Sequence, residues 1–146
     1  MPFKYQEYLS NFHPNCPNAN HFVERTVVGY RFLNSGVVNE QDFLPKAFSG
    51  EEIKELTCSH YAVSFFSSVE QIVTKLKSLN KKLDATKRHG SHCCEVNIIT
   101  TDGVTSPPSN SGHFAVHEYI EVSFIERARN ITNLTEQIQD RGGNAP

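Results

Sequence analysis

The residue types that bind metals and transfer protons near neutral pH are concentrated in the second half of this chain. The segment His89–Cys94 holds two of the seven histidines and two of the four cysteines. Two more histidines, His113 and His117, follow a loop rich in proline, serine and glycine, and Glu118 comes directly after them. Imidazole, thiolate and carboxylate groups are the usual metal ligands and proton carriers of proteins. Their spacing here matches no single motif, so the sequence leaves several chemistries open.

A metal site is one of these chemistries, because zinc sites combine ligands that are close in sequence with remote ones. The short-range groups that could contribute ligands are His13–Cys16, Cys58–His60, His89–His92–Cys93 and His113–His117. None of them is a CxxC pair, and four residues of a strand span about 13 Å, too far for one ion. No metal ligand is therefore assigned, and a Cys/His zinc-binding module stays an alternative to loop histidines and buried structural thiols.

The cysteines allow a nucleophile as well as a structural role. Cys58 precedes Ser59 and His60 and would be an activated thiolate if a base flanked it. Cys94 lies on the same strand face as apolar neighbours and is expected to be an inert core thiol. Cys93 and Cys94 point to opposite strand faces, so they are not expected to pair with each other. The start of the chain shows no apolar signal segment, and we therefore expect reduced thiols in a cytoplasmic protein.

Four further side chains are candidate catalytic residues, namely Arg31, Ser64, His113 and Glu118. An arginine within a strand must reach solvent or find an anion, and its planar fork suits a phosphate or a carboxylate. The Ser64 hydroxyl lies mid-strand, opposite its apolar neighbours. His113 follows a glycine-containing loop and could act as a base, while Glu118 interrupts the apolar alternation of a late strand.

The order of three segments along the chain is similar to the Arg–Ser–Glu order of ADP-ribosyltransferase-like domains. These segments are Arg31, Ser64–Ser68 and Glu118. The resemblance covers three short segments, about a tenth of the chain. It implies that the arginine grips a nicotinamide dinucleotide, that the serine strand shapes the nicotinamide pocket and that the glutamate orients the ribose. The chain departs from the family's acidic signature, since Glu118 and Glu121 cannot share one strand face. Pairing of Arg31 with an acid such as Glu95 is the structural alternative.

A second resemblance is to small bacterial proteins with a Tyr-Arg strand, a Val-Ser strand and a late Gly-His segment. The matching positions are Gly29–Arg31, Ala62–Phe65 and Gly112–Phe114. It implies a bacterial, cytosolic accessory protein and brings no activity with it.

Hydrophobic periodicity predicts the elements that position these side chains. Strands are expected at 26–33, 61–66, 92–100 and 114–124, short helices at 40–48 and 49–56, and longer helices at 69–83 and 125–138. Together they predict an α+β fold with a mixed, largely antiparallel sheet of about four to five strands and helices packed on one face. Residues 1–24 are expected to be irregular, 25–140 to form a single domain and 141–146 a flexible tail.

Composition narrows the function further. With 146 residues the chain has the size of one domain, and its net charge of −2 does not favour general nucleic-acid binding. No apolar run is long enough to cross a membrane. The first hypothesis is a small soluble module that acts through protein partners, as an accessory or regulatory component of a larger bacterial system, with aromatic residues near 3–32 at an interface. A nucleotide-handling enzyme with an Arg/Ser/His/Glu cleft is the alternative, and a small nucleotide ligand is possible in that case.

Overall fold

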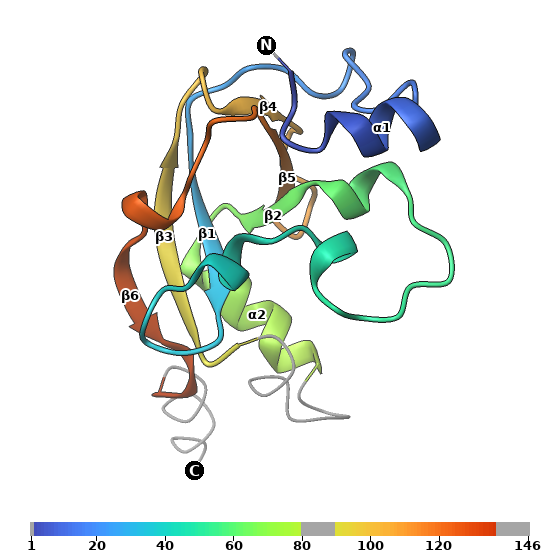
Figure 1. Cartoon of the computed structure of the whole chain (residues 1–146). Helices are drawn as coiled ribbons and strands as arrows, with labels where there is room; N and C mark the ends of the chain where they lie inside the picture. The colour runs from blue at the N-terminus through green and yellow to red at the C-terminus, as the bar shows by residue number, and fades with distance from the viewer. Residues whose placement is uncertain (1, 80–89, 137–146) are drawn as a thin grey trace.

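The computed structural model describes residues 2–79 and 90–136 and is built around a six-stranded antiparallel sheet (Figure 1). The strand order is β4-β5-β2-β1-β3-β6, and every strand pairing is antiparallel. The elements of the described residues, in chain order, are α1 (Gln6–Phe12), β1 (Val27–Leu33), the 3-10 helices η1 (Glu40–Phe43), η2 (Lys46–Phe48) and η3 (Cys58–Tyr61), β2 (Val63–Phe66), α2 (Val69–Leu79), β3 (His92–Ile98), β4 (Gly103–Thr105), β5 (His113–Glu118), the 3-10 helix η4 (Ile125–Arg127) and β6 (Arg129–Asn133).

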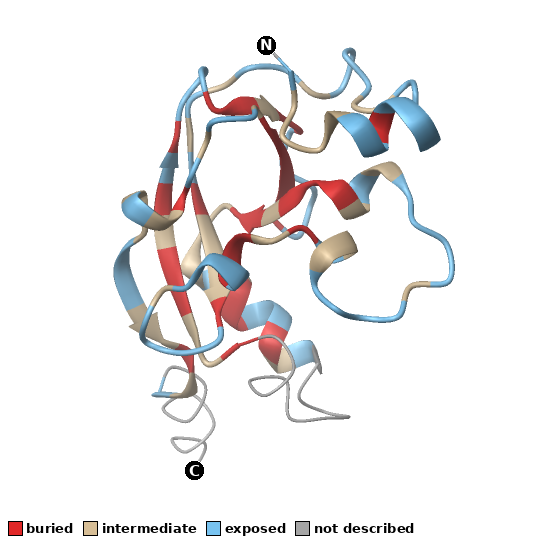
Figure 2. Cartoon of the chain, in the orientation of Figure 1, coloured by how far each residue is buried: buried red, intermediate tan, exposed pale blue. Residues whose placement is uncertain are grey.

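The central strands bury apolar side chains on both faces of the sheet (Figure 2). One face packs against α2, whose residues Ile72, Val73 and Leu76 are fully buried. This is the apolar stripe at three- and four-residue intervals that predicts the helix from the sequence. The other face carries the larger core cluster and is covered by loops and 3-10 helices. That cluster contains Leu33, Phe43, Val63, Phe65, Cys94, Val96, Ile98, Phe114, Val116 and Phe124.

Strand β1 owes its position at the centre of the sheet to its long register with β3. The two strands pair over seven residues, from Val27 opposite Ile98 to Leu33 opposite His92. Alternation places Cys94, Val96 and Ile98 in the larger core cluster, as their period-two pattern predicts. Cys93 faces the other side of the sheet and is also fully buried.

Several predicted elements differ from the structure. Residues 1–24 are not wholly irregular, because α1 forms at Gln6–Phe12, and no helix forms over 49–56. The predicted strand at 114–124 ends at Glu118. The sheet has six strands rather than four to five, since β4 and β6 were missed.

The predicted helix at 125–138 is wrong over 129–133, whereas residues 134–136 are helical and residues 137–138 lie outside the described residues. Residues 129–133 form strand β6, which pairs with β3 through Glu95 opposite Arg129. Asn130, Thr132 and Asn133 are poor helix formers, so an available sheet edge outcompetes the helix that an apolar stripe suggested. Residues 80–83 of the predicted helix at 69–83 and the predicted tail at 141–146 lie outside the described residues.

None of the helices in the described part of the chain has the length and the apolar character needed to span a bilayer.

Candidate functional site

A gap between β1 and β2 gives Arg31 its position. These neighbouring strands pair only where Tyr30 lies opposite Phe66, whereas β2 continues to pair with β5 along all four of its residues. Beyond Tyr30 the two strands diverge, and the carbonyl group of Ser64 has no β1 amide opposite it. A buried carbonyl needs a donor, and the side chain of Arg31 supplies one.

The guanidinium of Arg31 donates hydrogen bonds to three backbone carbonyls. Its Nη1 donates to the oxygen of Ser64 at 2.7 Å, its Nε to that of Asp42 at 2.5 Å and its Nη2 to that of Leu44 at 3.2 Å. The ring of Phe43 lies beneath the charge, with 6.0 Å between Cζ and the ring centre. Arg31 therefore ties the η1 segment to the open side of β2.

The carboxylates of Glu118 and Asp42 act on the charge of Arg31, but neither forms a direct ion pair with it. The ion pairs of the described residues belong to Lys4, Lys46, Arg127 and Arg129, and Arg31 is in none of them. Burial lowers the pKa of its guanidinium to about 10, so the group is still charged at neutral pH. A guanidinium has five N–H donors, and three carbonyl bonds leave two for another acceptor.

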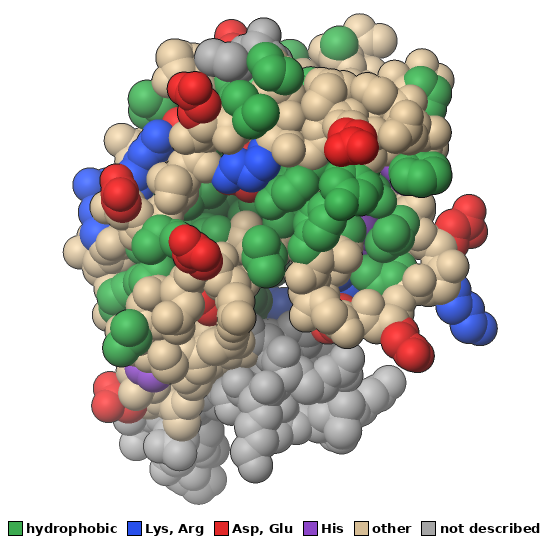
Figure 3. All heavy atoms as spheres, viewed as in Figure 1, with side chains coloured by type: hydrophobic (Ala, Val, Ile, Leu, Met, Phe, Trp, Pro, Cys, Tyr) green, Lys and Arg blue, Asp and Glu red, His purple; other side chains and the backbone are tan. Residues whose placement is uncertain are grey.

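A pocket of about 650 Å³ opens beside this guanidinium. Besides Arg31 it holds a second cation, Lys46, whose side chain is 58% exposed, and the aromatic ring of Phe48. The Phe48 ring stacks on Tyr5 with 4.6 Å between centroids and contacts Tyr8 edge-on. Figure 3 shows hydrophobic side chains gathered across this face of the molecule, around a hollow. The complete lining is Arg31, Phe32, Asn34, Gln41, Asp42, Leu44, Lys46, Phe48, Ser49, Gly50, Glu51, Ala62 and Ser64.

Only two of the four predicted catalytic residues meet at this pocket. Ser64 contributes its carbonyl to Arg31, but its side chain alternates with Phe65, which faces the larger core cluster. His113 is not a lining residue. His113 lies at the start of β5 and is exposed, although one part of its imidazole packs against the ring of Phe66, with 5.5 Å between centroids. This partial burial lowers the pKa of His113, and Lys75 adds a smaller effect in the same direction.

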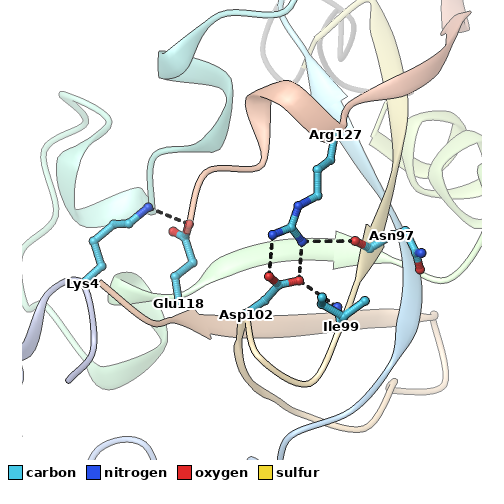
Figure 4. Close-up of polar contacts among 6 residues, drawn as sticks. All are labelled: Lys4, Asn97, Ile99, Asp102, Glu118 and Arg127. Carbon is cyan, nitrogen blue, oxygen red and sulfur yellow. Dashed lines mark hydrogen bonds and ion pairs between the residues drawn. The ribbon is translucent and has the colours of Figure 1, made fainter. Parts of the chain in front are cut away.

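Glu118 ends β5, five residues and roughly 17 Å along the strand from His113. Its carboxylate is buried and pairs with the ammonium of Lys4 at 2.9 Å (Figure 4). The same ammonium donates to the carbonyl of Val122. Burial raises the pKa of Glu118, and the hydrogen bond from Lys4 opposes this effect. Glu118 thus anchors the amino-terminal segment to the sheet.

A second buried ion pair lies near the first (Figure 4). Arg127 Nη2 donates to Asp102 Oδ1 at 2.7 Å, and the backbone amide of Ile99 donates to the other oxygen of Asp102, also at 2.7 Å. This pair closes the turn between β3 and β4. The predicted alternative partner of Arg31, Glu95, instead accepts hydrogen bonds from Tyr30 and Arg129.

The structure brings two cysteines and one histidine together from distant parts of the chain. Cys16 and Cys58 form a disulfide, which contradicts the expectation that all four cysteines are reduced thiols. The Nε2 atom of His117 lies 3.9 Å from the sulfur of Cys16 and 3.7 Å from that of Cys58. Cys93 and Cys94 are free, so the prediction that they do not pair with each other is confirmed.

Sequence reasoning missed part of both sites. The Cys/His cluster consists of Cys16, Cys58 and His117. Each of these residues comes from a different predicted pair, namely His13–Cys16, Cys58–His60 and His113–His117. Lys46 and Phe48 carry no motif and were not candidates. Their positions depend on how the η2 segment folds over the gap between β1 and β2, which no local pattern encodes.

Comparison of the chain with models of protein families, with curated proteins and with solved structures found no match.

Proposed function

We propose that this protein binds a small anionic ligand that carries a planar ring, of the nucleotide class, in the pocket beside Arg31. The observation that carries the proposal is a partly buried guanidinium that lines a pocket and forms no direct ion pair among the described residues. Removing a charge from water is costly unless an opposite charge compensates for it. A bound phosphate would supply that compensation through the two N–H groups that remain.

The rest of the lining favours a nucleotide over a simple anion. Lys46 adds a second cation at the exposed side of the pocket, where its ion pair with Glu51, at 3.8 Å, is open to solvent and can be exchanged for a phosphate. The ring of Phe48 offers a stacking surface for a base. A volume of about 650 Å³ lies within the range of small-ligand sites. Because His113 and Glu118 do not line the pocket, we propose binding and no reaction step.

Calorimetric titration tests the proposal with ADP, ATP, NAD, adenosine and inorganic phosphate. We expect the phosphorylated nucleotides to bind and adenosine to bind more weakly, because it lacks the group that Arg31 and Lys46 recognise. Lys46→Ala should raise the dissociation constant of the nucleotides by about tenfold, the equivalent of one charge-assisted contact. Arg31→Lys should remove the planar guanidinium, which can bind two phosphate oxygens side by side, and should weaken binding further.

Lys54→Ala is the matched control, because Lys54 is exposed on the same loop and does not line the pocket. Circular dichroism of each variant confirms that it is folded. If none of the phosphorylated ligands bound, or if Lys46→Ala and Lys54→Ala bound them equally well, the pocket would have no such role.

Action through a protein partner is the second candidate function, supported by exposed aromatic side chains on α1. Phe12 is 67% exposed and Tyr8 is 42% exposed, and their i, i+4 spacing places them on one helix face. A photo-crosslinking residue at Phe12 should capture a partner in cell lysate, whereas the same residue at Val37, which is 69% exposed, should not. Equal capture at both positions would count against a specific surface on α1.

A bacterial source and a cytosolic location stay predictions of the sequence. The Cys16–Cys58 disulfide weighs against the location, because disulfides persist mainly in oxidising compartments.

A further inference from the structure

We propose that Cys16, Cys58 and His117 form a redox-controlled zinc site, closed by the disulfide and opened to the metal by its reduction. The three ligand atoms all lie within 4.8 Å of one another. Two thiolates and one imidazole are a known ligand set of zinc centres that keep a fourth position for solvent or substrate. This site is separate from the pocket beside Arg31 and does not depend on it.

The distances from the histidine already fit a zinc ion. Zinc lies about 2.3 Å from sulfur and about 2.0–2.1 Å from nitrogen, so tetrahedral geometry separates a nitrogen ligand from a sulfur ligand by about 3.6 Å. The Nε2 atom of His117 lies 3.7 Å from one sulfur and 3.9 Å from the other. The two distances from nitrogen to sulfur therefore need little change. The distance between the two sulfurs lengthens when the bond between them is broken.

The fold holds the histidine in place while leaving the sulfurs accessible. His117 lies in β5, where its backbone pairs with Val104, and its side chain is buried. The rings of Phe22 and Phe3 lie edge-on to the imidazole, at 4.9 and 6.3 Å between centroids. Cys16 and Cys58 are only partly buried, so a reductant and a metal ion can reach them.

Zinc binds the neutral form of an imidazole and the deprotonated form of a thiol. Each cysteine must lose a proton to coordinate, and zinc bound to thiolates favours that loss.

The reaction balances with a dithiol as reductant and a small-molecule disulfide as oxidant. The dithiol transfers two electrons and two protons to the Cys16–Cys58 bond and becomes a disulfide itself, leaving two thiols on the protein. Zn²⁺ then displaces the two thiol protons and accepts the lone pair of His117. In the reverse direction, the disulfide oxidant takes two electrons from the thiolates and two protons from solvent, the Cys16–Cys58 bond forms again and Zn²⁺ is released.

Titration of the full chain with Zn²⁺ and with Co²⁺ tests the proposal, before and after reduction by a dithiol under nitrogen and removal of the reductant. We expect about one metal ion per reduced chain and none per oxidised chain. Bound Co²⁺ should show the thiolate charge-transfer absorption and the strong visible bands of tetrahedral coordination. Adding a disulfide oxidant should release the zinc to a chromogenic chelator.

Two variants and two controls locate the ligands. Cys58→Ser and His117→Gln should each weaken zinc binding by at least about tenfold, whereas His113→Gln, a histidine of the same strand outside the cluster, should leave it unchanged. Cys93→Ser controls for the free buried thiols. Zinc binding that is equal in both redox states, that is absent after reduction, or that survives in Cys58→Ser but not in Cys93→Ser would overturn the proposal. If His117→Gln failed to fold, the Co²⁺ spectrum of Cys58→Ser would still decide, since a thiolate absorption of unchanged intensity would exclude Cys58 as a ligand, whereas loss of one of two thiolates should lower it.

Discussion

At the scale of single residues, the structure shows how this chain keeps charges inside a small domain. Arg31 is surrounded by carbonyl oxygens, Glu118 by one ammonium group, and Asp102 by a guanidinium and a backbone amide. These arrangements offset the cost of burying a charge to different degrees. Burial lowers the pKa of Arg31 and raises that of Glu118.

The pH dependence of stability should report the burial of Glu118. A carboxyl whose pKa is raised on folding binds its proton more tightly in the folded chain. Its contribution to stability is therefore present below the unfolded value of about 4.3 and is lost as the pH rises through the folded value. We expect Glu118→Gln to gain stability relative to wild type in urea denaturation as the pH rises above about 4.3.

Glu121→Gln serves as the control for this measurement, because Glu121 is exposed. A stability difference between Glu118→Gln and wild type that did not change with pH would contradict the assignment.

The free thiols should be unreactive in the folded protein. Burial raises the pKa of Cys93 to about 11 and that of Cys94 to about 12, and both side chains have no exposed surface. The thiolate is the reactive form, so iodoacetamide at about pH 8 should label neither cysteine in the native state. Mass spectrometry should find two labels after denaturation without reductant and four after denaturation with reductant. Four labels without reductant would show that Cys16 and Cys58 are not joined.

At the scale of elements, the gap between β1 and β2 is the feature that creates the pocket. Long pairing of β1 with β3 fixes one side of β1, and the single β1–β2 pair at Tyr30 leaves the other side open. The η1 and η2 segments fold over that opening. The carbonyls of Asp42, in η1, and Leu44, directly after it, accept hydrogen bonds from Arg31. A side chain thus replaces part of a strand ladder, which is how an irregular segment becomes attached to a regular sheet.

Close packing on β1 should make Gly29 intolerant of a side chain. A Cβ at this position would lie 2.8 Å from Cδ1 of Phe65 and 3.0 Å from Cζ of Phe114, two rings that stack at 5.8 Å. Overpacking of this kind costs about 1–3 kcal/mol. We expect Gly29→Ala to lower the free energy of unfolding by that amount in urea denaturation. Gly36→Ala, at an exposed position where the nearest atom is 3.4 Å away, should change it little, and equal effects of the two would refute the packing argument.

At the scale of the whole molecule, several contacts fasten the amino-terminal segment to the rest of the structure. Cys16 is bonded to Cys58, Lys4 pairs with Glu118, and Phe3 forms an isolated bridge with Tyr119. These contacts place the first part of the chain over the end of the sheet at β5. They also bring Cys16 close to His117, which lies on β5, and so complete the cluster of Cys16, Cys58 and His117.

Loss of the disulfide should lower global stability. The bond joins residues 42 positions apart, and the chain-entropy model assigns about 4 kcal/mol to a loop of that size. We expect the Cys16→Ser, Cys58→Ser double variant to unfold at lower urea concentration than the oxidised wild type, with both proteins kept free of metal by a chelator. The reduced wild type is the control and should match the double variant. Equal midpoints for all three proteins would mean that the bond does not restrain the unfolded chain.

Local pattern determined a large part of this protein. Alternation identifies β1, β2 and β3, an apolar stripe identifies α2, and the arginine in β1 stands out because a strand rarely buries a charge. These features could be predicted because each depends on residues within one or two turns or pleats of one another.

Tertiary structure decided the rest. Residues 129–133 became a strand because β3 offered an unpaired edge, although their apolar spacing resembles a helix. The Cys16–Cys58–His117 cluster and the pocket beside Arg31 combine segments that are far apart in the chain. Such contacts depend on which strands become neighbours, and a one-dimensional pattern holds no record of that choice.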